Sequence, residues 1–363
     1  MHGCPDAPPA LVVQSRFARV RRVPAATDLI TSPFEPLVVG AADGLRIAVL
    51  PYGARLAALW VPARAGPVNV VLGYSDYRHY ASDRAFHGAP IGRVSGRIAQ
   101  ACFELSGRSH RLEPNEPPHH LHGGPLGFHA RTWRVLQVDR GATPRLVLQL
   151  TLEDGADGYP GRLETTLTYT LEPDALRVEL VARIDRQGPI ATTMHPYFNL
   201  GGAHDRPIDD HLLAVEADDV LELDAALIPT GARLAVARTP FDFRSEAAIG
   251  ERLATTHPQL HLARGLDHAY VLAPVRERDA RLRHPGTGLA MSVVSNQPTL
   301  QVYSGQYLAP PTPDAAPWGP RCGLCLEPQG FPNAVNEPHF PSSLRRAGES
   351  HVNTIRYVFS EWL

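Results

Sequence analysis

Hydrophobic and polar residues alternate with a period of two along much of this chain. Between positions 163 and 171, the odd positions hold Leu, Thr, Leu, Tyr and Leu, and the even positions hold Glu and Thr. After the segment EPDA at 172–175, the alternation resumes over 176–183. Because successive side chains of a strand point to opposite faces, the pattern predicts a β-hairpin with one hydrophobic face and one solvent-exposed face.

Short stretches of the same kind recur through the chain, whereas helical periodicity is confined to 245–252. Most of the 35 Pro and 30 Gly fall between these stretches. Many short strands separated by Gly/Pro turns predict an all-β fold, a large antiparallel β-sandwich with very little helix. The further predicted strands are 45–50, 55–61, 68–72, 101–105, 133–138, 145–152, 212–215, 269–272, 289–294, 300–303, 324–326 and 353–359.

The domain organisation follows from what the middle of the chain lacks. No charge run, low-complexity linker or fixed-period repeat divides it, so we expect one domain over 37–363. We expect residues 1–36 to form an N-terminal extension that packs along an edge or is poorly ordered. That segment has no secretory pattern, and no apolar run approaches the length of a membrane span, so we expect a cytoplasmic protein without a membrane partner.

Charge and cysteine usage exclude several classes of protein. The net charge is −2, which gives no basic field for nucleic acid. All 35 basic residues are Arg, and the absence of Lys excludes Schiff-base chemistry and a P-loop lysine. Cys322 and Cys325 form a C-x-x-C with no second pair. Because the surrounding sequence is typical of a strand, on which positions three apart face opposite sides, we expect neither a zinc site nor a redox pair.

Two histidine-containing segments stand out as candidate chemistry. His195 precedes Pro-Tyr-Phe, so a side chain that titrates near neutrality lies beside Tyr197 and Phe198, either of which can give a sugar-sized ligand an apolar face. Four His fall within 119–129, and on a strand His120 and His122 would share one face. That spacing leaves a metal site open as an alternative, although no nearby carboxylate completes a ligand set.

Two carboxylates and two arginines complete the candidate groups. Asp267 precedes the strand 269–272 and has the alternative role of capping a turn. Glu327 follows an apolar stretch and is either exposed at a strand end or held in a cleft with a raised pKa. Arg93 and Arg97 flank small residues and offer forked hydrogen-bond donors.

Nine ordered segments spanning about 37–363 resemble the aldose 1-epimerase (galactose mutarotase) family. The segments that contain His195 and Glu327 are the most specific. The nine are GRVSGRI from Gly92, LHGGPLGF from Leu121, DGYPG from Asp157, HPYFNLGG from His195, LIPTG from Leu227, TPFDFR from Thr239, GLDH from Gly265, LQVYSG from Leu300, and CLEPQGFPNAVNEPHFPSSLRRAGE from Cys325.

The resemblance implies a galactose mutarotase-type β-sandwich that interconverts the α and β anomers of an aldohexose such as galactose or glucose. It implies that Glu327 is the general base and His195 the general acid, and that no metal or cofactor takes part. It further implies a small-molecule sugar as the partner of a monomer or homodimer. The implied sugar-binding residues are His122, Asp267, Arg97 and Gln301.

The chemistry of anomer exchange adds an expectation about proton affinity. The ring opens when the O1 hydroxyl is deprotonated and the ring oxygen is protonated, and each such group contributes about 10²–10⁴-fold. Burial is expected to raise the pKa of Glu327, and the neighbouring carboxylate is expected to favour protonated His195.

Two departures from the family pattern and three alternatives remain at this point. Gly96 and Met194 stand where the family often has Asn, which bears on sugar specificity. One alternative is a hexose 6-phosphate epimerase that uses Arg93 and Arg97. The others are a non-catalytic carbohydrate-binding protein and a metal-dependent β-barrel enzyme that uses His120, His122 and His195.

Overall fold

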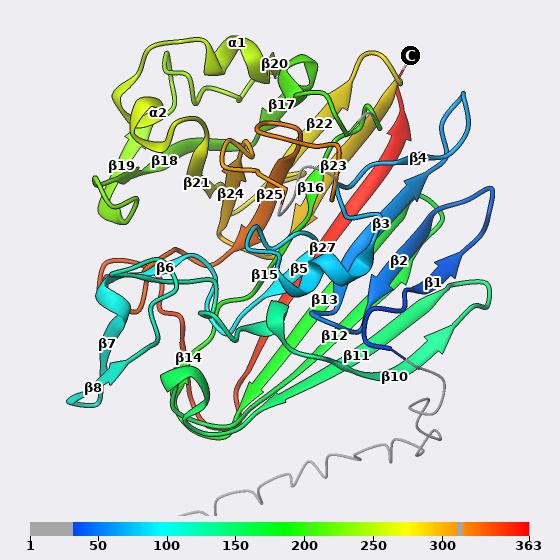
Figure 1. Ribbon diagram of the computed structural model, residues 1–363. Coiled ribbons are helices and arrows are strands. Elements are labelled where there is room, and N and C mark those ends of the chain that lie inside the picture. The colour runs from blue at the N-terminus through cyan, green and yellow to red at the C-terminus, as the bar shows by residue number, and fades with distance from the viewer. Residues whose placement is uncertain (1–31, 203, 311–314, 363) are drawn as a thin grey trace, which may run out of the picture.

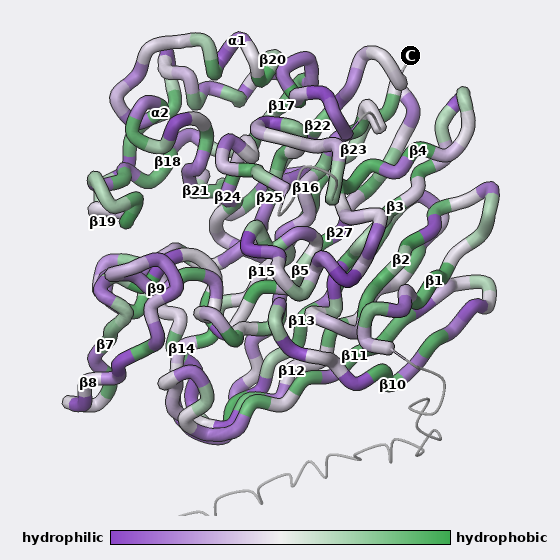
Figure 2. The backbone as a smooth tube through the Cα atoms, viewed as in Figure 1, coloured by the Kyte–Doolittle hydropathy of each residue, from purple (hydrophilic) through white to green (hydrophobic). Residues whose placement is uncertain are grey.

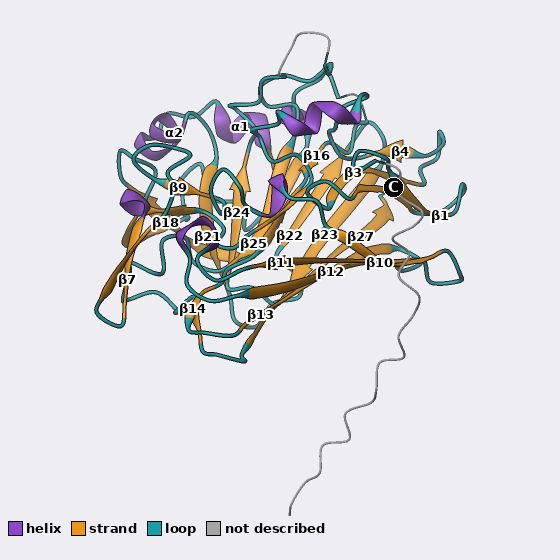
Figure 3. Ribbon diagram, turned by 60° about the horizontal axis from the view of Figure 1, so that its bottom comes forward, coloured by secondary structure: helices purple, strands orange, loops and turns teal. Residues whose placement is uncertain are grey.

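The computed structural model describes residues 32–202, 204–310 and 315–362, and strands dominate it (Figures 1 and 3). The helices of the described part are short: α1 (Ile249–Leu253), α2 (Pro258–Ala263) and 3₁₀ turns. None of the described helices has the length and apolar character to cross a membrane. Most of the expected N-terminal extension, 1–31, lies outside the described residues. The 3₁₀ turns are η2 (Tyr77–Ala81), η3 (Ala99–Ala101), η4 (Phe128–Ala130), η5 (Ala156–Gly158) and η6 (Ile208–Asp210).

One layer is a nine-stranded antiparallel sheet whose strands run side by side across Figure 1. It contains the predicted hairpin, in which Leu167 lies opposite Leu180 and the leucines of both strands face inward. In spatial order the strands are β10 (Arg134–Asp139), β11 (Arg145–Leu152), β12 (Leu163–Leu171), β13 (Ala175–Ile184), β27 (Ser350–Glu361), β23 (Leu289–Ser295), β22 (Ala280–His284), β17 (Leu212–Val215) and β20 (Ala247–Ala248).

The second layer joins a four-stranded sheet to a six-stranded sheet. The junction is the segment 70–72, where Val71 bridges Phe198 and the Leu72 amide donates to the Tyr197 carbonyl at 2.9 Å. The four strands are β1 (Leu37–Gly40), β2 (Arg46–Leu50), β3 (Arg55–Val61) and β4 (Val68–Asn69). The six are β16 (Tyr197–Phe198), β25 (Leu324–Gln329), β24 (Thr299–Tyr303), β21 (Asp267–Leu272), β18 (Ala217–Leu223) and β19 (Pro229–Ala235).

Four two-stranded ladders connect the remaining segments. They are β5 (Ala89–Ile91) with β15 (Thr193–His195), β6 (Arg97–Ile98) with β9 (His120–Leu121), β7 (Cys102–Leu105) with β8 (Arg108–Arg111), and β14 (Gly188–Pro189) with β26 (Leu344–Arg345).

The main core lies between the two layers and draws side chains from all three large sheets. Leu59 of β3, Leu167 of β12 and Leu326 of β25 belong to it and are fully buried. Each such burial contributes about 1.5–3 kcal/mol relative to an exposed side chain. Figure 2 shows hydrophobic residues recurring along the strands of both layers. An inward-facing apolar row therefore fixes the orientation of each strand, and with it the direction of the residues between.

The structure corrects several predicted element bounds. The predicted helix 245–252 is helical only from Ile249, because Ala247 and Ala248 pair with β17. The predicted strand 68–72 ends at Asn69, because its later residues bridge the two sheets. β21 begins at Asp267, and β25 continues to Gln329, so Asp267 and Glu327 lie within strands instead of in a turn or at a strand end. The pattern also missed α2, which has Pro258 in its first turn and a His257 side chain capping its start.

A buried ion cluster ties β3 to the segment 83–88. The Asp83 carboxylate accepts hydrogen bonds from Arg55 at 2.6 Å, from His87 Nδ1 at 2.9 Å and from the Tyr74 hydroxyl at 3.0 Å. The side chains of Asp83 and Arg55 are each 1% exposed. Burial alone would raise the pKa of Asp83, but His87, Arg55 and the hydrogen bonds that the carboxylate accepts outweigh it and hold the pKa below its usual value.

We predict that Asp83→Asn lowers the free energy of unfolding by about 3–5 kcal/mol, because it leaves the Arg55 charge buried without its partner. Urea unfolding at pH 7 measures the loss. The folded-state pKa of Asp83 lies below the unfolded value, so the stabilisation is present above about pH 4 and is lost as the pH falls. The control is Asp218→Asn, which removes an exposed pair with Arg244. Equal unfolding midpoints for the two variants would contradict the prediction.

Candidate active site

A cavity of about 690 Å³ opens over the face of the six-stranded sheet that points away from the main core. All six residues that the resemblance implicates line its wall. Three come from the sheet and three from segments that fold over it. The sheet contributes Asp267, Gln301 and Glu327, and the covering segments contribute Arg97, His122 and His195.

Strand register aligns the three sheet residues. Gln301 of β24 lies directly opposite Glu327 of β25, and Asp267 of β21 lies opposite Tyr303 of β24. In β25, Leu324 and Leu326 enter the main core, so Glu327 points to the other face. The same apolar alternation that anchors the sheet thus directs these polar side chains into the cavity.

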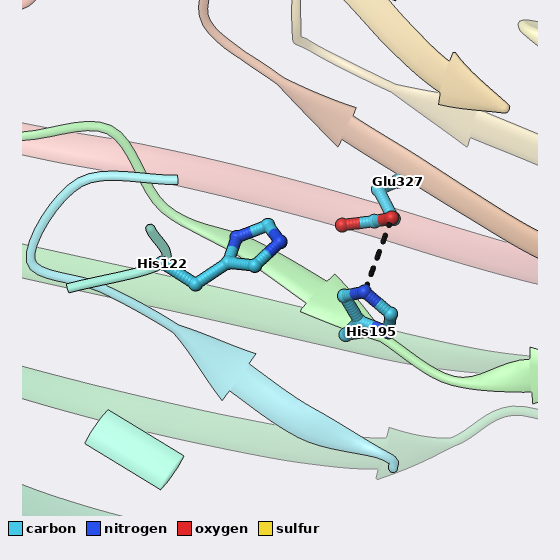
Figure 4. A group of neighbouring side chains, drawn as sticks. All are labelled: His122, His195 and Glu327. Atoms are coloured by element: carbon cyan, nitrogen blue, oxygen red, sulfur yellow. Dashed lines mark ion pairs between the residues drawn. The ribbon is translucent and has the colours of Figure 1, made fainter. Parts of the chain in front are cut away.

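His195 faces Glu327 across the cavity wall, as Figure 4 shows. Its Nε2 lies 3.5 Å from Glu327 Oε1, and the two side chains are 5% and 2% exposed. The other nitrogen, Nδ1, lies 3.4 Å from Cys325 Sγ. Glu327 Oε2 is buried, and within the described part of the chain no group bonds it. The two titratable groups are therefore buried and near hydrogen-bond distance of each other.

Burial shifts the pKa values of this pair in opposite directions. It raises the pKa of Glu327 well above its usual value, and the Asp267 carboxylate adds to the rise. It lowers the pKa of His195 to about 3, outweighing a hydrogen bond to the residue's own backbone that raises it. The rise for Glu327 confirms the expectation, whereas the expected preference for protonated His195 is wrong. Desolvation of the imidazolium is the largest influence on this pKa.

His122 enters the cavity as a hydrogen-bond donor. Its Nδ1 accepts from the Gly96 amide at 3.2 Å, so the neutral ring carries its hydrogen on Nε2. Burial is the main reason that its pKa lies well below the usual value. Its ring lies edge-on to that of His195, with the centroids 5.3 Å apart.

The expected pairing of His120 and His122 on one strand face is wrong. β9 ends at Leu121, and His122 adopts a φ of +53°, which breaks the alternation. His120 bonds the Tyr159 hydroxyl and the Glu113 carbonyl, and it does not line the cavity. The donor atoms of His122, His195 and Glu327 lie within 4.8 Å of one another. A metal would need the lone pair on the cavity side of His122, but the neutral ring carries hydrogen there.

A chain of polar contacts lines the far side of the cavity. Glu116 binds Arg97 through both carboxylate oxygens, at 2.5 and 2.8 Å. Arg97 Nη1 lies 4.0 Å from Asp267, which accepts from Gln301 Nε2 at 2.7 Å. Burial raises the pKa of Asp267 more than Arg97 lowers it. These groups present hydrogen-bond donors and acceptors on one wall of the cavity.

Sequence reasoning missed three aromatic members of the site. Phe86 packs its ring against those of His122 and His195, and its φ of +59° is unusual for a bulky residue. Tyr303 and Tyr307 stack at 6.4 Å on the cavity wall. The alternation of 301 and 303 on one strand was a signal for Tyr303. No local pattern marked Phe86, because its role depends on the fold.

The structure also places the other candidate residues, some of them outside the cavity and some on its wall. Arg93 is buried and donates to the carbonyls of Pro189 and Gly161, so it does not reach the cavity as the hexose 6-phosphate alternative needs. Tyr197 lines the cavity, whereas Phe198 faces the main core. Cys322 accepts from the Gly319 amide and Cys325 contacts His195, so each thiol has its own partner. Both are free thiols.

A second His and carboxylate group lies outside the cavity. Asp210 contacts His211 Nδ1 at 3.0 Å and His284 Nε2 at 3.3 Å. His211 Nε2 accepts from the Leu200 amide, so the neutral ring carries its hydrogen on Nδ1 and donates to Asp210. The group is thus a hydrogen-bonded triad.

Comparisons with known proteins identify the family of this chain. The family model described as Aldose 1-epimerase matches residues 36–358. Galactose mutarotase from Sus scrofa is 36% identical over 323 residues, which cover 88% of this chain and 92% of the relative. Aldose 1-epimerase from Escherichia coli (strain K12) is 32% identical over 336 residues, 90% of this chain and 95% of the relative.

Two solved structures share the fold. A GalM/aldose epimerase homologue from C. elegans has a TM-score of 0.83 at 30% identity and covers 90% of this chain and 99% of its own. Galactose 1-epimerase from Lactobacillus acidophilus NCFM has a TM-score of 0.81 at 28% identity, with 90% and 95% covered. The predicted β-sandwich of the galactose mutarotase type is confirmed, and the chain belongs to the aldose 1-epimerase family.

Proposed function

We propose that this chain is an aldose 1-epimerase that interconverts the α and β anomers of an aldohexose such as galactose or glucose. The observation that carries the proposal is the buried contact of 3.5 Å between His195 and Glu327 in a cavity of sugar-binding size. The names of the pig and bacterial relatives support the same reaction.

In the proposed mechanism, Glu327 takes the proton of the anomeric hydroxyl while His195 protonates the ring oxygen. The C1–O5 bond breaks, its electrons pass to O5, and C1 and O1 become an aldehyde. Rotation about C1–C2 exposes the other face of the carbonyl. Ring closure then returns one proton to O1 from Glu327 and one from O5 to His195, so the enzyme ends as it began.

The pair needs one shared proton throughout this cycle. The closed sugar reacts with ionised Glu327 and protonated His195, and the open-chain sugar coexists with both groups neutral. Burial favours the neutral form of each group in the free site. A hydrogen bond from the O1 hydroxyl to the Glu327 carboxylate, and one from protonated His195 to O5, therefore have to stabilise the charged form. Apparent pKa values measured kinetically belong to the pair.

The other cavity groups bind and orient the sugar in this proposal. Neutral His122 donates from Nε2 to a sugar oxygen near the reacting centre. Arg97, Asp267 and Gln301 contact ring hydroxyls, and Tyr197 offers an apolar face. The cytoplasmic location and the state of monomer or homodimer stay predictions.

We predict that Glu327→Gln and His195→Asn each reduce the rate of mutarotation by about 10²–10⁴-fold, because each removes one proton-transfer group. Polarimetry on freshly dissolved α-D-galactose or α-D-glucose measures the rate. Glu179→Gln changes a strand carboxylate outside the cavity and serves as the control. If the unmodified protein relaxes the rotation no faster than buffer, the proposed function is wrong. If the unmodified protein is active and the two variants are equally fast, the assignment of the acid and base is wrong.

We predict that Asp267→Asn moves the alkaline limb of the pH profile of kcat/KM to lower pH. The limb reports loss of the shared proton of the pair. Burial raises the pKa of Glu327 first, and the Asp267 charge raises it further, so removing that charge lets the proton leave at lower pH. Glu116→Gln is the control, because this carboxylate binds Arg97 and does not raise the pKa of Glu327. An unmoved limb in Asp267→Asn would contradict the electrostatic account.

A further inference from the structure

The strand that carries Glu327 is incompletely paired on the side of His195. β25 pairs with β24 from Cys325 to Gln329, but on its other side β16 pairs only with Leu324 and Cys325. Beyond that point no strand of the described chain continues the ladder. The next residue after Glu327 is Pro328, whose carbonyl needs a partner in this buried position.

Two side chains supply that partner. Thr193 Oγ1 donates to the Pro328 carbonyl at 2.8 Å, and Asn353 Nδ2 donates to the same oxygen at 2.9 Å. Asn353 Nδ2 also donates to the Thr192 carbonyl at 2.6 Å. Thr192, Thr193 and Asn353 are all fully buried. Asn353 therefore joins Thr192, the residue that precedes the strand of His195, to the strand of Glu327.

These bonds lie very near the reacting groups along the chain. Thr193 precedes His195 by two residues on β15, and Pro328 follows Glu327 on β25. A shift of β15 relative to β25 at this point would change the 3.5 Å separation of the acid and the base. A displacement of about 1 Å between reacting groups is enough to lower a rate by about 10²-fold.

Stability alone does not account for an Asn at position 353, because burying its amide group is energetically unfavourable. It lies on the inward face of β27, in line with Ile355 and Tyr357 of the main core. Its Oδ1 is buried, and within the described part of the chain nothing bonds it. An apolar residue would avoid the desolvation of that oxygen, so the two hydrogen bonds of its amide group are the feature that distinguishes Asn here.

We propose that Thr193 and Asn353 are positioning residues that hold His195 and Glu327 at the separation required for proton transfer. The proposal rests on the proposed function of the site. Neither side chain lines the cavity, so both act through the backbone of the two strands.

The test compares two matched threonines. Thr193→Val keeps the shape and removes the hydroxyl, and Thr193→Ser restores it. In the control Thr299→Val, the lost hydroxyl also donates to a β25 carbonyl, that of Gln329 at 2.9 Å, from an equally buried site on β24. We expect Thr193→Val to lower kcat by about 10–100-fold with KM within about two-fold, and Thr193→Ser to recover most of the rate. Thr299→Val should keep kcat near the unmodified value at a similar loss of stability.

Asn353→Leu adds a second arm. The Thr193 hydroxyl and the Asn353 amide donate to the same carbonyl, that of Pro328. The loss of kcat in the double variant Thr193→Val/Asn353→Leu should therefore differ from the sum of the two single losses, expressed as free energies. Equal kcat losses in Thr193→Val and Thr299→Val, or a loss confined to KM, would overturn the proposal.

A spectroscopic readout separates this proposal from the proposed function. The imidazole ¹⁵N resonances of His195 report its contact with Glu327 without any sugar. They should shift in Thr193→Val and stay in place in Thr299→Val. Unchanged His195 resonances in Thr193→Val would overturn the positioning role even if the protein is an active mutarotase. Absence of mutarotation by the unmodified protein would instead overturn the proposed function. The His195 resonances would then still decide whether Thr193 positions this side chain.

Discussion

The contact between His195 and Glu327 is the constraint on which the rest of the site depends. Both groups have to exchange protons with one small ligand, so they must lie a few ångströms apart and be shielded from competing water. β25 meets this demand because it has two faces. Leu324 and Leu326 fix the strand in the main core, and the next position along the strand points Glu327 to the opposite face, into the cavity. A shift of the β25 backbone at Glu327 would therefore disturb the packing of the core.

The same burial that fixes the pair also sets its charge. A low-dielectric site disfavours both the carboxylate and the imidazolium, so the free site favours the neutral pair and the charged pair that reacts with the closed sugar depends on the bound sugar. Asp267 opposes ionisation of Glu327, while Arg97 lies near enough to moderate Asp267. The sugar-binding side of the cavity is therefore electrostatically linked to its proton-transfer side, and hydroxyl recognition and proton affinity are not independent properties.

Much of the fold was predictable because period-two alternation reports which face of a strand is buried. The hairpin 163–183 forms as predicted, and β3 has the predicted bounds, 55–61. Other features depend on contacts between distant segments. The strand predicted over 324–326 continues to Gln329, because β24 pairs with it as far as that residue. The left-handed φ of His122 turns its side chain away from the face that His120 occupies, and no local sequence pattern predicts that turn. The lowered pKa of His195 follows from burial, which sequence neighbours do not specify.

Two groups of buried polar side chains lie on opposite sides of β15. On one side, Asn353 and Thr193 bond the strand of Glu327. On the other, the Asp83 cluster orders the segment 83–88, whose Gly88 amide donates to the His195 carbonyl at 3.0 Å, and the Tyr197 hydroxyl donates to Ala85 in the same segment. Polar groups in an apolar interior are stabilising only when their geometry is well satisfied, and they then permit few alternative arrangements. A purely apolar interface would pack as tightly but would tolerate sliding of one strand past another. Directional bonds on both sides of β15 remove that freedom at the point where a reaction by proton transfer tolerates it least.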